Sequence, residues 1–267
     1  MIDIHNHILP GIDDGPTNWD EALELARNAV ENGITTVIAT PHHAHELYNN
    51  PNDHRQVESL TEQLNERLKL AGIPLQVHSG QEIRVHQDLL DRWDEGETGG
   101  LLTLGYTQYM LIELPSSRVP EGTEELVYEL ILKGIIPIIA HPERNRELAN
   151  DPEQLRRLVD NGALAQVTAH ALTGVFGRGV EKAAWMMCAQ GLIHFVASDA
   201  HHATKRSFGL REAYERIQEK MGVQAVHYYK RNAQLLLDNA SIQPAAVTTA
   251  ATEGAWSKVK QLFGLRK

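Results

Sequence analysis

Residues 192–202 read LIHFVASDAHH, a mostly apolar run that ends in Asp199, His201 and His202. A short, continuous apolar run is typical of a parallel strand that is covered on both faces. Carboxylate and imidazole groups follow it at once, and these are side chains that hold divalent metal ions. The stretch therefore predicts a buried strand with metal ligands at its carboxyl end.

The same pattern recurs along the whole chain, with a helical segment after most of the apolar runs. Residues 19–32 show apolar side chains at helical spacing, with Asn18 as the N-cap and Gly33 as the stop. Seven strands are predicted, at 2–5, 34–40, 74–79, 109–114, 135–140, 163–169 and 192–198. Further helices are predicted at 55–71, 124–133, 152–161 and 179–190. This alternation indicates an α/β protein with a parallel sheet.

Two α/β architectures fit such alternation, a (β/α) barrel and an open, doubly wound sheet. An open sheet usually carries a glycine-rich phosphate loop after an early strand, and neither GxGxxG nor GxxxxGK[ST] occurs in this chain. We therefore predict a distorted (β/α)7 TIM-like barrel. Its active site would lie at the C-terminal rim of the strands.

The composition is that of an acidic chain with very little cysteine. Its formal net charge of -10 disfavours a nucleic-acid partner, because phosphate backbones attract a basic surface. The single cysteine, Cys188, is typical of a reducing compartment. Neither a signal peptide nor a membrane span is evident in the sequence. We expect a soluble, cytoplasmic protein.

The strand and helix pattern stops near residue 239, which divides the chain into a barrel domain at 1–240 and a tail at 241–267. Residues 241–255 are rich in Ala, Thr and Ser and resemble a linker. Residues 256–267, WSKVKQLFGLRK, predict a short basic amphipathic helix. Such a helix suits a weak contact with a membrane surface or a partner protein, or docking on its own domain.

Ligand-type side chains follow every predicted strand. They are His5 and His7 with Asp13 and Asp14 in the next loop, His42 and His43, Glu82, Glu113, His141 with Arg144, His170, and Asp199 with His201 and His202. Alternate residues of an extended segment point the same way, so an HxH pair can face one ion. Imidazoles and carboxylates without thiolates predict a polynuclear site for Mn, Fe or Zn.

The charges of such a site would favour a phosphate monoester. Four carboxylates, those of Asp14, Glu82, Glu113 and Asp199, would leave three divalent ions with a net positive charge. Guanidinium groups on loops at the same rim would add donors for phosphate oxygens, and Arg144 and Arg206 are the candidates.

Taken together, the motifs resemble the PHP (polymerase and histidinol phosphatase) superfamily of metal-dependent phosphoesterases over residues 1–240. They are HNH (5–7), GIDDG (11–15), TPHH (40–43), GQE (80–82), the Glu of LIELP (111–115), AHPER (140–144) and SDAHH (198–202). The DDGP, HPER and SDAHH contexts are most similar to the bacterial manganese-dependent protein-tyrosine phosphatases. Those enzymes act opposite the tyrosine autokinases of capsule and exopolysaccharide synthesis.

The resemblance implies a site for three divalent ions, as Mn²⁺, with Fe or Zn as alternatives. It assigns the first ion to His5, His7, Glu82 and Asp199, the second to Glu82, Glu113 and His141, and the third to Asp14, His42 and His201. Arg144 and Arg206 resemble the phosphate-binding arginines of the family, whereas Asp13 receives no ion.

The implied activity is the hydrolysis of tyrosine phosphate by a metal-activated hydroxide, without a covalent intermediate. Its partners would be a phosphotyrosine protein, such as a bacterial tyrosine autokinase, and that kinase's substrates. Cys188 lies in an apolar helical stretch and lacks an Arg six residues later, which argues against a cysteine nucleophile. His43 or His202 would be the general acid, if one is used.

Three other functions stay open on the sequence alone. One is another PHP phosphomonoesterase, such as a histidinol-phosphate phosphatase. A metal-dependent amide or lactone hydrolase is the second, although no Lys stands at the strand ends. The third is a non-catalytic, metal-stabilised scaffold that binds a phosphoprotein.

Overall fold

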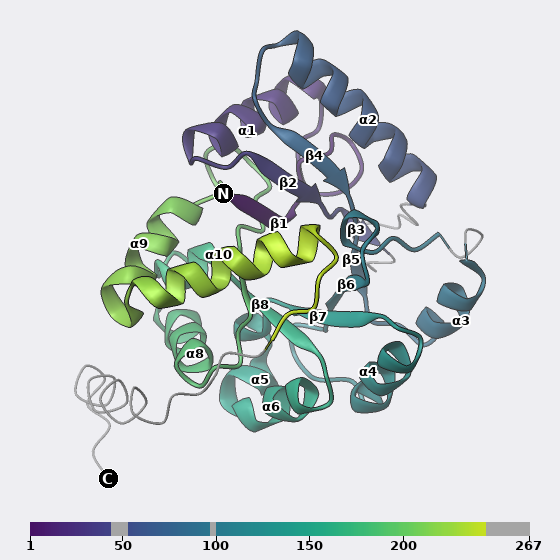
Figure 1. Ribbon diagram of the computed structural model, residues 1–267, viewed down its shortest axis with the longest axis vertical. Coiled ribbons are helices and arrows are strands. Elements are labelled where there is room, and N and C mark those ends of the chain that lie inside the picture. The colour runs from purple at the N-terminus through teal and green to yellow at the C-terminus, as the bar shows by residue number, and fades with distance from the viewer. Residues whose placement is uncertain (44–52, 97–99, 244–267) are drawn as a thin grey trace.

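Parallel strands alternate with helices through the structure, a computed structural model that describes residues 1–43, 53–96 and 100–243 (Figure 1). The strands are β1 (Ile2–Asn6), β2 (Thr36–Ala39), β3 (His42–His43), β4 (Gln76–Ser79), β5 (Glu82–Arg84), β6 (Tyr109–Glu113), β7 (Ile136–Ala140), β8 (Leu164–Thr168) and β9 (Phe195–Ala197). Each predicted apolar run contains or overlaps one of these strands. The prediction of seven strand positions is therefore confirmed.

Helices follow most of the strands and surround them (Figure 1). They are α1 (Trp19–Glu31), α2 (His54–Leu70), α3 (Leu89–Asp94), α4 (Thr123–Leu132), α5 (Arg146–Asn150), α6 (Pro152–Asp160), α7 (Ala169–Leu172), α8 (Arg178–Ala189), α9 (Leu210–Met221) and α10 (Val223–Leu237), with short 3-10 turns η2 (Leu104–Tyr106) and η3 (Pro142–Arg144). The expected N-cap of α1 is present, since the Asn18 side chain accepts from the Glu21 N–H at 3.0 Å. Helices α9 and α10 were not predicted.

The strands pair in two parallel sheets, with the orders β1-β2-β4 and β3-β5-β6-β7-β8-β9. Two chain segments run from one sheet into the other: β2 continues into β3 across Thr40 and Pro41, and β4 continues into β5 across Gly80 and Gln81. The nine strands therefore occupy seven consecutive positions. One position is shared by β2 and β3, and the next by β4 and β5.

The two edges of this series meet where β1 lies beside the end of β9. The backbone N–H of Asp199 donates to the His5 carbonyl at 2.8 Å. One residue earlier, Ser198 donates to the buried Asp3 carboxylate from its backbone N–H at 2.8 Å and from its hydroxyl at 2.6 Å. These bonds join the first strand, β1, to the last strand, β9. They close the series into the distorted seven-stranded barrel that the sequence predicts.

An apolar layer of the barrel lies directly beneath the polar rim. Side chains two residues apart in a strand share a face, so the face that carries Leu111 in β6 continues into Glu113. Similarly, the face of Ala197 in β9 continues into Asp199. Leu111 and Ala197 belong to a buried cluster that also includes Leu236 of α10. The rim residues are thus held on a packed support.

The described residues cover the predicted barrel domain, apart from 44–52 and 97–99. Of the predicted tail at 241–267, the structure describes residues 241–243; the rest of the predicted linker and the amphipathic segment lie outside the described residues. Within the described ranges, no helix combines the length and the apolar character needed to cross a membrane.

Candidate metal centre

The nine predicted ligands lie close together at the carboxyl ends of the strands. Their nitrogen and oxygen atoms form four overlapping groups, each with all atoms within 4.8 Å of one another. The groups are His7, Asp14, His42 and His201; His5, Glu82 and His141; His5, His7 and Asp199; and His42, Glu82 and Glu113. The structure thus places together side chains from six strands and from the loop after β1.

The four proposed ligands of the first ion have a regular arrangement. The Nε2 atoms of His5 and His7 each lie 3.4 Å from Glu82 Oε2 and 3.4 Å from Asp199 Oδ1. This separation is long for a hydrogen bond, but it is about what ligands ~2.1 Å from one ion in tetrahedral geometry would show. Both Nε2 atoms and Glu82 Oε2 are buried without a hydrogen-bond partner. These residues fit a divalent ion.

The other ring nitrogen of each histidine is held by a neighbouring side chain. His7 Nδ1 lies 2.6 Å from Asp13 Oδ2, and His5 Nδ1 lies 2.9 Å from Gln166 Oε1. Such partners fix the tautomer and turn Nε2 toward the ion. A register shift in β1 between Asp3 and Asn6 accompanies this arrangement, and irregularities of this kind re-aim side chains.

The loop after β1 is built around the Asp13 carboxylate. Its Oδ1 accepts from the Gly15 N–H at 3.0 Å, and its Oδ2 also accepts from the His42 N–H at 3.1 Å. A Cβ at Gly15 would lie 2.2 Å from the His7 carbonyl oxygen, so only glycine fits there. Asp13, to which the sequence assigned no ion, therefore connects two ligands.

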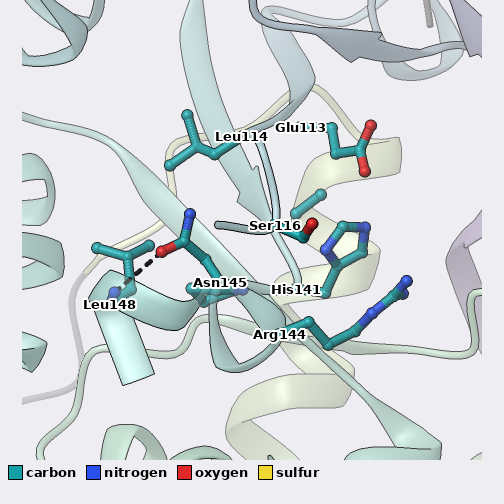
Figure 2. A pocket seen from close by; sticks show the side chains of 9 residues that line it. Glu113, Leu114, Ser116, His141, Arg144, Asn145 and Leu148 are labelled. Atoms are coloured by element: carbon teal, nitrogen blue, oxygen red, sulfur yellow. Dashed lines mark hydrogen bonds between the residues drawn. The ribbon is translucent and has the colours of Figure 1, made fainter. Parts of the chain in front are cut away.

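Two predicted ligands of the second ion come from β6 and from the end of β7. His141 Nε2 lies 2.7 Å from Glu82 Oε1, and Glu113 Oε2 lies 3.0 Å from Arg84 Nη1. Figure 2 shows Glu113, His141 and Arg144 around a small pocket, with their polar ends toward the same side. His141 has a φ of 31°, a left-handed conformation that is costly for a residue with a Cβ and recurs at functional sites.

The residues predicted for the third ion also meet. Asp14 Oδ1 lies 3.1 Å from His201 Nε2 and 3.6 Å from His42 Nε2. His201 Nδ1 lies 2.9 Å from the Asp199 carbonyl oxygen, which favours a proton on that nitrogen. This tautomer leaves the lone pair of Nε2 facing Asp14.

Both predicted phosphate-binding arginines converge on one carboxylate. Arg144, in η3, and Arg206, in the loop before α9, each form an ion pair with Asp199 Oδ2. Arg206 Nη1 also lies 3.2 Å from His201 Nε2. The Arg144 and Arg206 side chains are 33% and 24% exposed, so they reach from the buried centre to solvent.

Two carboxylates at the centre, those of Glu82 and Asp199, are held in their ionised form. Burial alone would raise the pKa of Glu82 and of Asp199, but the nearby His5 imidazole opposes it in both cases. The two arginines add to this effect at Asp199. The pKa of each carboxyl consequently lies well below its ordinary range, and the centre presents negative charge to a cation.

Other histidines at the predicted rim lie outside the four ligand groups. His43 is buried and its ring lies 6.3 Å from that of His86, while His202 is exposed. His170 is buried in α7. Burial raises the pKa of the Cys188 thiol to about 12, which makes this side chain a poor nucleophile.

The chain folds as a distorted (β/α) barrel with imidazoles, carboxylates and two arginines at its rim. This combination is that of a metal-dependent enzyme. The chain belongs to the CpsB/CapC family of capsular polysaccharide synthesis, whose model matches residues 1–241. The family predicted from the rim motifs is thereby confirmed.

Relatives of this family resemble the chain over nearly its full length. The tyrosine-protein phosphatase YwqE of Bacillus subtilis is 45% identical, with 91% of this chain and 93% of the relative covered. The putative tyrosine-protein phosphatase CapC of Staphylococcus aureus is 37% identical, with 96% and 98% covered. A chain from the crystal structures of YwqE and Streptococcus pneumoniae CpsB, described as unique metal-dependent tyrosine phosphatases, superposes with a TM-score of 0.87 at 43% identity, covering 91% of this chain and 97% of that one.

Proposed function

We propose that this chain is a metal-dependent protein-tyrosine phosphatase. The observation that carries the proposal is the arrangement of two imidazoles and two carboxylates 3.4 Å apart, buried beside two arginines. Relatives that are 45% and 37% identical and are named tyrosine-protein phosphatases support the substrate class.

The proposed centre holds three divalent ions, with Mn²⁺ as the proposed metal. His5, His7, Glu82 and Asp199 would bind the first; Glu82, Glu113 and His141 the second; and Asp14, His42 and His201 the third. The two oxygens of Glu82 face different predicted ligands, Oε2 toward His5 and His7 at 3.4 Å and Oε1 toward His141 at 2.7 Å, which supports shared use of that carboxylate. Divalent ions here would supply positive charge for phosphoryl oxygens and lower the pKa of a coordinated water.

The arginines would bind and orient the phosphoryl group. A guanidinium group offers several donors in a plane, which match phosphate oxygens better than a lysine does. Arg144 and Arg206 would exchange part of their contact with Asp199 for contact with the substrate.

The leaving group of tyrosine phosphate is a phenolate. Because the pKa of the corresponding phenol is about 10, the departure of the phenolate needs less help from an acid than the departure of an alkoxide.

The proposed substrates are phosphotyrosine proteins of capsule and exopolysaccharide synthesis, including a bacterial tyrosine kinase and the proteins that it modifies. The description of the family as one of capsular polysaccharide synthesis supports this setting.

The test is hydrolysis of p-nitrophenyl phosphate and of a phosphotyrosine peptide with added Mn²⁺, with and without a chelator. We expect both to be hydrolysed, with activity lost on chelation and restored by metal. A phosphoserine peptide and a lactone serve as comparison substrates. Hydrolysis of the lactone without hydrolysis of either phosphate ester would refute the proposal. Anomalous scattering from crystals grown with Mn²⁺ would count and locate the ions.

A further inference from the structure

A groove of about 750 Å³ opens on the side of the barrel between α3 and the segment that leads into α4. Val85 and Pro115, which follow β5 and β6, line its inner end. The Val85 N–H donates to the Glu113 carbonyl at 2.9 Å. This groove therefore begins one residue from the Glu113 and Arg84 pair at the metal centre.

The lining of the groove is apolar below and acidic along one wall. The partly buried side chains of Leu90 and Leu126 contribute apolar surface. Glu121 is exposed just before α4, and Glu125 and Glu129 are exposed on α4 itself. Residues four apart on a helix share a face, so Glu125 and Glu129 present their carboxylates side by side.

The same lining contains a single Lys or Arg, Arg118, within the described residues. Three carboxylates against one guanidinium leave the groove negative. The metal centre next to it contains Arg144 and Arg206, and would become positive once its divalent ions are bound. One substrate molecule that spans both regions would have to carry a negative group at one end and positive groups at the other.

An ion pair joins the two helices that form the walls. Lys133, which caps α4, lies 2.7 Å from the Asp94 carboxylate at the end of α3. The pair lies one turn beyond Glu129. It links the end of α3 to the end of α4, the two helices that flank the groove.

We propose that this groove binds the segment that flanks the phosphotyrosine in a protein substrate and selects segments with Lys or Arg. The inference rests on the proposed phosphatase function and specifies its substrate. The phosphate would occupy the metal centre, the chain beside it would run over Leu90 and Leu126, and its basic side chains would meet the carboxylates of α4. Surface charge pairs of this kind change affinity modestly and capture rate more strongly.

The test compares phosphotyrosine peptides of one length that carry two Lys, two Gln or two Glu on one side of the phosphotyrosine, with each side tried in turn. For one of the two sides we expect kcat/KM to fall from the Lys to the Glu peptide, by about fivefold or more at low salt. The difference should shrink at about 0.5 M salt, because screening weakens exposed pairs.

Variants in the groove locate the effect. The E125Q/E129Q pair should remove the preference, and E125K/E129K should reverse it, with p-nitrophenyl phosphate hydrolysis unchanged in both. The matched control is E215Q/E219Q, an exposed pair with the same spacing on α9, on the opposite side of the molecule (Figure 1). The control should keep the preference.

Two outcomes would overturn the inference separately from the proposed function. If the wild-type protein hydrolyses the three peptides equally on both sides, or if E125K/E129K leaves the order unchanged, the groove does not select basic segments. If the metal-loaded protein hydrolyses neither the peptides nor p-nitrophenyl phosphate, the phosphatase function itself fails and the groove proposal fails with it.

Discussion

Asp13 illustrates how a residue that would bind no ion can still determine the site. Its carboxylate lies against His7 Nδ1 and also accepts from the backbone of His42, so it orients two proposed ligands at once. From the sequence it was a ligand-type side chain to which no ion was assigned, although the adjacent Asp14 was assigned one. The geometry gives the reason for this difference: Asp14 faces His201, whereas Asp13 faces Nδ1 of His7, the ring nitrogen opposite the proposed ligand atom.

We expect Asp13→Asn to weaken metal binding by about 10- to 100-fold, because the amide holds the His7 ring less firmly and makes it less basic. The measurement is a titration of the metal-free protein with Mn²⁺, followed by activity and calorimetry. Excess metal should recover most of the turnover. An unchanged metal affinity in a folded Asp13→Asn protein would show that this contact has no role in the centre.

Arg144→Ala should act on turnover and leave the metal in place. Removing one preorganised donor to a developing negative charge costs about 100-fold or more in kcat. Metal content is measured by elemental analysis of the same preparation. Arg157→Ala is the control and should be fully active, because Arg157 of α6 forms an exposed pair with Glu124 of α4, away from the centre. Loss of metal from Arg144→Ala would mean that the guanidinium mainly supports Asp199.

At the scale of the elements, β8 and β9 are joined through a buried histidine. His194 donates from its backbone N–H to the Ala165 carbonyl at 2.8 Å, and its Nδ1 accepts from the Ala165 N–H at 3.2 Å. Burial lowers the pKa of this imidazole from 6.5 to about 4. The side chain therefore supplies a strand-like hydrogen bond only while it is neutral.

The pH dependence follows from this lowered pKa. As the pH falls from 6.5 toward 4, the unfolded chain takes up a proton that the folded chain refuses, so His194 lowers the free energy of unfolding by up to about 3 kcal/mol. Above 6.5 the contribution of His194 to pH dependence vanishes. His194→Asn keeps an acceptor near Nδ1 but cannot titrate.

The measurement is urea unfolding of the metal-free wild-type and His194→Asn proteins at about pH 7 and pH 4.5. The variant is expected to be less stable at pH 7, because the smaller side chain leaves a void. Its loss of stability on acidification should be smaller than that of the wild type. Equal losses in the two proteins would assign the acid sensitivity to other groups.

The sequence predicted the elements well where one physical signal dominates. Continuous apolar runs identify the seven strand positions because parallel strands are buried on both faces. The breaks inside two of them were not predicted, although Pro41 and Gly80 mark them. A Cβ at Gly80 would lie 2.9 Å from Ile38 Cγ2, a close approach between strands that no local pattern reveals. Helices α9 and α10 follow the last strand, so no later strand marks them as part of the alternation that guided the prediction.

At the scale of the whole molecule, the sequence predicted which side chains would gather but not how they pair. The carboxyl ends of parallel strands share one rim, so residues as distant as His5 and Asp199 could be placed together. The convergence of Arg144 and Arg206 on the same oxygen of Asp199 depends on loop paths. Those paths are fixed by long-range contacts that a single sequence does not encode locally.

Removing the metal should destabilise the whole barrel, because the centre brings together buried carboxylates that repel one another. Binding to the folded state alone adds about 2.7 kcal/mol per site at a metal concentration 100 times Kd. We expect Tm to fall with a chelator and to rise with increasing Mn²⁺. In Asp199→Asn the Mn²⁺-dependent rise should be much smaller. A Tm that does not respond to Mn²⁺ in the wild type would contradict a metal centre of this kind.

The closure between β1 and β9 also constrains how the protein is made. His5 leaves the ribosome early, but its partner Asp199 emerges nearly two hundred residues later, so the first ligands wait through most of synthesis without the last. Contacts between such distant residues are slow to form. The ion site consequently stays incomplete during most of synthesis. The enzyme can bind its full set of metal ions only after its last strand, β9, and the adjoining Asp199 are in place.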